Sequence, residues 1–118
     1  MMRVMKKTRD LKIILDGRKL SIPNVVNSGF YLKFKGLMFR REDRFQALLF
    51  SNSKNRGIHS FFVFFKFLCV WLDDKNKVVD YKIVNPFNLY VKSSANFSKI
   101  LEIPLNNSYK KILTKFKY

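Results

Sequence analysis

The chain has 118 residues, 47% of them hydrophobic, and its 24 Lys and Arg against 8 Asp and Glu give a formal net charge of +16. This length and apolar content predict a single domain, residues 1–118, that buries about two-thirds of the surface its unfolded form exposes. The lone cysteine excludes a disulfide framework and a paired-cysteine metal site, so a reducing, cytoplasmic setting is expected.

The first predicted element is a β-hairpin. Residues 11–15 alternate weakly between apolar and polar side chains, and Asp16-Gly17 precedes a second short strand over residues 19–22. Asp-Gly favours a tight turn because both residues tolerate a positive φ. Pro23 is expected to end the hairpin.

The next stretch is ambiguous. Residues 24–35 fit either a short helix capped by Asn27 or Ser28 or an extended piece, and the helix is favoured. A short apolar strand is predicted over residues 47–50, and a loop rich in Ser and Asn over residues 51–57.

The longest apolar run, IHSFFVFFKFLCVWLD at residues 58–73, is expected to form the core. Both parities of the run are apolar, which predicts a strand buried on both faces, or two strands broken near Lys66. A membrane-spanning helix needs roughly 20 apolar residues. This run is shorter and contains a lysine, so no transmembrane segment is expected.

A second hairpin is predicted directly after this run. The residues from Asp73 to Asn76 form a polar turn into a strand over residues 77–84, which Pro86 ends. Residues 88–94 are a candidate for a further short strand.

The chain is expected to end with one strand and a short helix. Residues 99–103 alternate as a strand before Pro104. A helix, or a helical turn followed by a frayed strand, is predicted next, with Asn107 or Ser108 as its cap. The helical spacing is carried by four apolar residues: Tyr109, Ile112, Leu113 and Phe116. Together these elements predict a mainly β fold, a small partly closed β-barrel with one or two short helices.

Several short blocks stand in a fixed order between residues 30 and 104: GLMFR at 36–40, LLF at 48–50, IHSFF at 58–62, VWLD at 70–73, NKVV at 76–79, PF at 86–87 and ILEIP at 100–104. Their order and spacing resemble the domain-of-unknown-function family numbered 192. The resemblance implies a compact, mainly β domain with no established biochemical activity. The family usually has a proline, an aliphatic residue and an aspartate where this chain has Lys66, Phe67 and Leu68, so it resembles a divergent member and no role of that carboxylate is expected.

No catalytic constellation can be named, and neither a metal site nor a cofactor is expected. His59 is the only histidine and has no second His or Cys at ligand spacing, so a structural hydrogen-bonding role is favoured over a general base or ligand. Cys69 lies among apolar residues and is expected to be an inert small hydrophobe. Asp73 and Asp74 fall in the predicted turn, where backbone geometry favours them without any catalytic role.

Aromatic and basic residues interleave near the glycine block. If such stretches are extended, bases and aromatics lie on opposite faces, which weakens the case for a base-stacking platform. Arg40 and Arg41 are the best candidates for a contact site, with Met38 and Phe39 as adaptable apolar cover. The alternative, which is favoured, is an exposed strand end with two solvated guanidinium groups. The full set of predicted binding residues is Lys33, Lys35, Met38, Arg40, Arg41 and His59.

The positive charge is concentrated at the two ends of the chain, since residues 1–41 carry +9, residues 42–80 carry +1 and residues 81–118 carry +6. Such an excess attracts polyanions at long range, which predicts an accessory module that touches RNA, DNA or ribosomes through phosphates. The alternative is a protein- or small-ligand-binding domain, with a cleft bearing Met38, His59 or Arg40 and a charge set by genome composition. The 17 Lys and 10 Asn are also typical of an AT-rich coding sequence.

Overall fold

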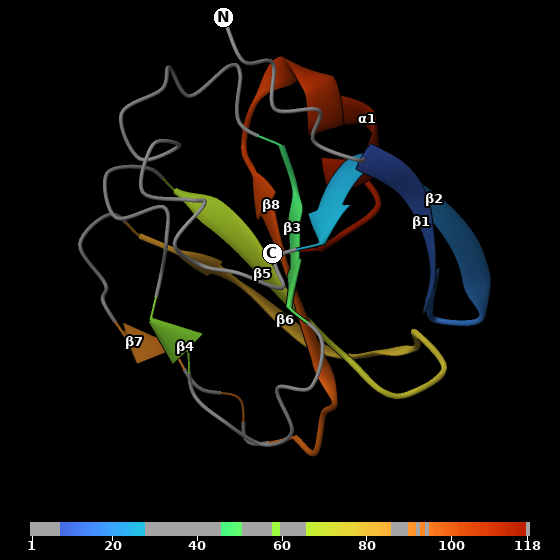
Figure 1. Ribbon diagram of the computed structural model, residues 1–118, viewed down its shortest axis with the longest axis vertical. Helices are drawn as coiled ribbons and strands as arrows, with labels where there is room; N and C mark the ends of the chain where they lie inside the picture. Colours follow the sequence, from blue (N-terminus) through green and yellow to red (C-terminus); the bar gives the residue numbers. More distant parts are fainter. Residues whose placement is uncertain are drawn as a thin grey trace, which may run out of the picture.

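The computed structural model describes residues 8–27, 46–50, 58–59, 66–85, 90–91, 93 and 95–117, and all structural statements below concern these residues (Figure 1). Six strands form one curled sheet in the order β1-β2-β3-β8-β5-β6, and two short strands, β4 and β7, pair separately. The strands of the large sheet are β1 (Thr8–Leu15), β2 (Arg18–Asn27), β3 (Leu48–Phe50), β5 (Phe67–Leu72), β6 (Val78–Val84) and β8 (Lys99–Pro104). The small sheet contains β4 (Ile58–His59) and β7 (Tyr90–Val91). A 3₁₀ turn, η3 (Asn107–Tyr109), leads into the short helix α1 (Lys110–Leu113).

This architecture confirms the predicted mainly β fold. Neighbouring strands of the large sheet pair antiparallel except β2 and β3, which are parallel. The sheet curls until its two outer strands meet at one end, where Ile14 N donates to Asn76 O at 2.9 Å and Ile14 forms a parallel bridge with Lys77. In Figure 1 the turn between β5 and β6 lies beside the tip of the β1–β2 hairpin. The sheet is therefore a half-barrel.

Both predicted hairpins are present. Asp16 and Gly17 have φ values of 50° and 78°, the left-handed conformation that this tight turn requires. In the second turn, Asp73 Oδ1 accepts hydrogen bonds from Lys75 N at 2.8 Å and from Lys77 N at 2.9 Å. Asp73 thus has the backbone role at this turn that the sequence predicts.

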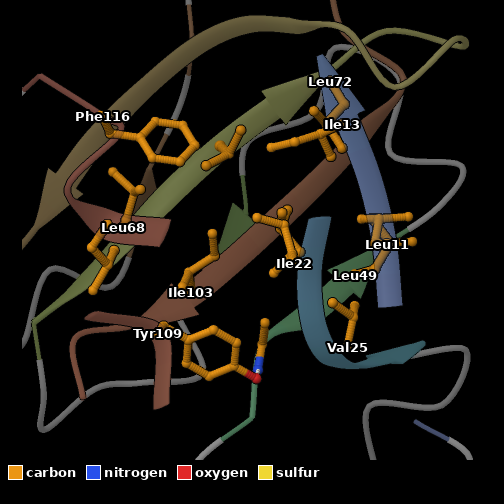
Figure 2. Packing of buried hydrophobic residues seen from close by; sticks show 14 of the residues in the cluster. Leu11, Ile13, Ile22, Val25, Leu49, Leu68, Leu72, Ile103, Tyr109 and Phe116 are labelled. Atoms are coloured by element: carbon orange, nitrogen blue, oxygen red, sulfur yellow. Dashed lines mark hydrogen bonds between the residues drawn. The ribbon is translucent and has the colours of Figure 1, made fainter. Parts of the chain in front are cut away.

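Strand β5 runs through the middle of the core. All six of its residues are buried, as expected for a strand covered on both faces. Leu68, Val70 and Leu72 face the concave side of the sheet and pack with side chains from β1, β2, β8 and the C-terminal residues, as Figure 2 shows. Phe67, Cys69 and Trp71 face the convex side and pack in a second cluster.

The predicted end of the first hairpin at Pro23 is wrong, because β2 continues to Asn27. Leu11 pairs with Ile22 and Arg9 pairs with Val25, so two residues of β2, Pro23 and Asn24, lie opposite the single residue Asp10 of β1. This is a β-bulge, which tolerates a proline because one residue there is left out of the ladder. Asn24 has a φ of 52°, the left-handed conformation that one residue of a β-bulge can adopt.

The helix favoured for residues 24–35 is also wrong over residues 24–27, which belong to β2. Val25 belongs to the concave cluster and Val26 to the convex cluster, the alternation of a strand covered on both sides. Residues 28–35 lie outside the described residues, as does the loop predicted at 51–57. Among the described residues, no helix has the length and apolar character needed to cross a membrane.

Candidate nucleic-acid interface

The C-terminal segment, residues 105–117, begins with a capped turn. Asn106 Oδ1 accepts a hydrogen bond from Ser108 N at 3.0 Å, so Asn106 is the cap. The prediction of Asn107 or Ser108 as the cap is therefore wrong. The segment then forms η3 and α1, and the predicted spacing is confirmed, since Tyr109, Leu113 and Phe116 are buried in the concave core. A helix of one turn has little stability of its own, so this packing holds it in place.

Two tyrosines fix the segment to the sheet. The Tyr109 hydroxyl accepts a hydrogen bond from Ala47 N at 2.7 Å and donates one to Asn24 O at 3.1 Å. The Phe116 ring packs edge-on against Tyr81 of β6, with ring centroids 5.0 Å apart. Lys117 N donates to the Tyr81 hydroxyl at 3.3 Å. The C-terminal segment is therefore anchored at Tyr109 and again at its end, at Phe116 and Lys117.

The outer face of the C-terminal segment is basic. It carries four exposed lysines: Lys110, Lys111, Lys115 and Lys117. From residue 103 to residue 118 the sequence contains no Asp or Glu, so no carboxylate of the segment itself neutralises these charges. Ammonium groups on an anchored backbone are suited to bind phosphate oxygens.

A pocket of about 350 Å³ opens beside these lysines. Its apolar lining consists of Leu105 together with the buried Leu113 and Phe116. Its rim is polar, with the exposed Asn107, Lys110 and Thr114 beside the half-buried Asn106. The pocket thus combines apolar lining residues, hydrogen-bonding groups and one cation.

The described part of the chain does not test the predicted binding residues. Lys33, Lys35, Met38, Arg40 and Arg41 lie outside the described residues. The backbone of His59 pairs with Tyr90 in the small sheet, and its side chain lies outside the described part of the chain. These six residues therefore remain a prediction.

The lysines of the C-terminal segment were not among the predicted binding residues. The sequence did contain a signal for them, because the helical spacing of Tyr109, Leu113 and Phe116 assigns the intervening lysines to the opposite face. The complete lack of acidic residues after Glu102 was a second signal.

Three residues with ionisable side chains, Cys69, Lys82 and Glu102, lie on neighbouring strands of the sheet. Glu102 of β8 is fully buried and lies opposite Cys69 of β5, which in turn pairs with Lys82 of β6. Burial raises the pKa of the Cys69 thiol well above its ordinary value of 9.0, with a further increase from Glu102 that Lys82 partly offsets. A protonated, inaccessible thiol is a poor nucleophile and a poor metal ligand, as expected from its apolar surroundings. Among the described residues, no three His, Cys, Asp or Glu side chains are grouped to hold a metal ion.

This burial of Cys69 predicts a loss of stability at alkaline pH. Above pH 9.0 the thiol ionises in the unfolded chain and stays protonated in the folded chain. The unfolded state then binds fewer protons than the native state, so the free energy of unfolding falls with rising pH, by up to about 1.4 kcal/mol per pH unit for this group. Urea unfolding of the wild type and Cys69→Ala between about pH 8 and about pH 10.5 should give a shallower decline for the variant. Parallel declines would contradict the prediction.

The comparisons with known proteins support the fold alone. No protein-family model matches the chain, and no curated protein matches it. A crystal structure of a candidate transcription regulator from Sinorhizobium meliloti superposes on 94% of this chain and 90% of its own, with a TM-score of 0.64 and 15% sequence identity. The half-barrel of this chain is therefore a fold that a solved bacterial protein also has.

Proposed function

We propose that this protein is an accessory module that contacts RNA or DNA through phosphates, with the C-terminal segment as its main contact surface. The observation that carries the proposal is the presence of four exposed lysines on a segment without Asp or Glu. Because Tyr109 and Phe116 anchor this segment to the sheet, its lysines project from an ordered backbone. Less entropy is lost when such groups bind than when they extend from a flexible tail.

The net charge of +16 supports the same proposal at longer range. A strongly positive protein attracts nucleic acid before specific contacts form, which raises the rate of association at low salt. The description of the similar Sinorhizobium meliloti protein as a candidate transcription regulator is compatible with this role. The alternative, a cleft bearing Met38, His59 or Arg40, involves side chains outside the described residues.

We also propose that the chain is a divergent member of the domain-of-unknown-function family numbered 192, which it resembles. Three of its blocks fall on strands that lie side by side in the sheet: LLF is β3, VWL ends β5 and ILEIP occupies most of β8. Blocks that form adjacent central strands are what a shared fold would retain, and this placement supports the proposal.

The test of phosphate contact is the salt dependence of binding. Filter binding of the full chain to a generic RNA, and to a duplex DNA of the same length, is measured across a salt series. Contact with about five phosphates predicts a log–log slope near −3.5 for single strands or near −4.5 for duplex DNA. Absence of binding at about 50 mM salt would remove the proposal.

The position of the contact surface is tested by two variants with equal loss of charge. Replacing Lys110, Lys111 and Lys115 by alanine should weaken binding uniformly across sequences and reduce the magnitude of the single-strand slope by about 2. The control replaces three exposed basic residues of the first hairpin, Lys12, Arg18 and Lys19, by alanine. Equal effects of the two variants would mean that the charge acts as a diffuse field without a defined surface.

A further inference from the structure

We infer that the pocket beside Lys110 binds one unpaired nucleotide, so that the protein prefers single-stranded over double-stranded nucleic acid. This inference rests on the proposed function and names its ligand class. Small-molecule sites are clefts of about 300–1,000 Å³, mostly apolar and with a few polar groups that fix orientation. The pocket, at about 350 Å³, is at the small end of this range and suits a ligand the size of one nucleotide better than a dinucleotide cofactor.

The lining of the pocket matches the three parts of a nucleotide. The half-buried Leu105, with the small exposed parts of Leu113 and Phe116, offers apolar contact for a base, and the Phe116 ring is held by packing against Tyr81. Lys110 at the rim offers an ammonium group for the phosphate. None of the described residues that line the pocket carries a carboxylate, which favours an anionic ligand there.

Two rim side chains can contact the polar edge of a base. The Asn107 amide is exposed and provides both a donor and an acceptor. Thr114 Oγ1 donates its proton to Lys111 O at 2.6 Å, which leaves the hydroxyl oxygen as an acceptor for a ligand donor. Proteins read unpaired bases by such hydrogen bonds to base edges, which are inaccessible while the base is stacked in a duplex.

The location of the pocket connects it to the phosphate-binding surface. Lys110 lines the pocket and is one of the four exposed lysines, and Lys111 follows it directly. A strand whose backbone follows the lysines can therefore place one base in the pocket without leaving the basic surface. A duplex can reach the lysines but cannot present an unstacked base.

The experiment compares an 8-nucleotide single strand, a duplex of the same length and adenosine monophosphate as probes of the full-length protein. The test variant is Asn107→Ala with Thr114→Val, which keeps all lysines. Roughly tenfold weaker binding of the single strand, with duplex binding unchanged, is expected. The control variant, Asn85→Ala with Asn96→Ala, changes two exposed asparagines that do not line the pocket and should leave both affinities unchanged.

A second variant tests the pocket independently, in case Asn107→Ala with Thr114→Val fails to fold. Leu105→Phe fills part of the pocket without removing a polar group, and it should also lower the affinity for the single strand alone. Changes in the NMR amide shifts of Asn107 and Thr114 on addition of adenosine monophosphate would show that the nucleotide binds in the pocket. Displacement of adenosine monophosphate by the single strand would show that the strand occupies the same pocket.

The outcomes separate this inference from the proposed function. Equal affinity of single strand and duplex, with both pocket variants behaving as wild type, would overturn the inference and leave phosphate contact standing. Failure of both oligonucleotides to bind at low salt would overturn both. Binding of adenosine monophosphate that the single strand does not displace would overturn the assignment to a strand.

Discussion

Replacing Trp71 by alanine is expected to lower the free energy of unfolding by about 3–5 kcal/mol. Trp71 is fully buried in β5, and its ring lies 6.3 Å from the Phe97 ring and under the Lys82 ammonium group at 5.4 Å. Truncation removes the largest side chain of the convex cluster and leaves a cavity that the two flanking strands, β6 and β8, cannot close without moving. Urea unfolding followed by far-UV circular dichroism measures the change without depending on tryptophan fluorescence.

The matched control is Val79→Ala, because Val79 is 37% exposed and its truncation should change stability by no more than about 0.5 kcal/mol. Trp71→Phe should cost less than Trp71→Ala, since it retains most of the ring volume. It also removes the buried indole N–H, which has no hydrogen-bond partner among the described residues. A loss for Trp71→Ala as small as that for Val79→Ala would show that the convex cluster does not stabilise the fold.

Replacing Tyr109 by phenylalanine is expected to cost about 1–3 kcal/mol, although only one oxygen atom is lost. That oxygen accepts from Ala47 N and donates to Asn24 O, and the first of these bonds is buried. Phenylalanine fills the same space but leaves the Ala47 amide without its acceptor, which costs more than removing both members of a pair. Thermal and urea unfolding of the variant measure the loss.

Tyr81→Phe is the control for this second substitution. The Tyr81 hydroxyl also accepts from a backbone amide, Lys117 N, but over a longer distance of 3.3 Å and at an exposed position where water can replace it. Its removal should therefore change stability by only a few tenths of a kcal/mol, roughly the scale of surface substitutions. Equal losses for the two variants would contradict the anchoring role of Tyr109.

The parts of the fold that were predictable are those with local causes. Asp16-Gly17 favours a tight turn by its backbone conformation alone, and the two apolar parities of residues 67–72 predict burial on both faces wherever the strand lies. The role of Pro23 could not be predicted from local sequence. Whether a proline ends a strand or occupies a bulge depends on the pairing with β1, which local sequence does not contain.

The candidate site was less predictable, because a surface is defined by which segments meet in space. The lysines of the C-terminal segment form a pattern in the sequence, but the contacts that anchor the segment are distant along the chain. Tyr109 bonds to Ala47, 62 residues away, and Lys117 bonds to Tyr81, 36 residues away. The pocket forms where the capped turn at Asn106 folds back towards Phe116, and no residue pattern specified that return. Net charge predicts a class of partner but not a location.

The place of β8 in the sheet has a consequence for how the chain folds during synthesis. β8 is the last of the described strands along the chain, yet within the sheet it lies between β3 and β5 and joins the β5–β6 hairpin to the other strands. Until it emerges, β3 and β5 present unpaired edges, and such edges are sites of misassociation between nascent chains. The first hairpin can form early from local contacts, whereas the joined sheet must wait for the distant pairing that β8 supplies.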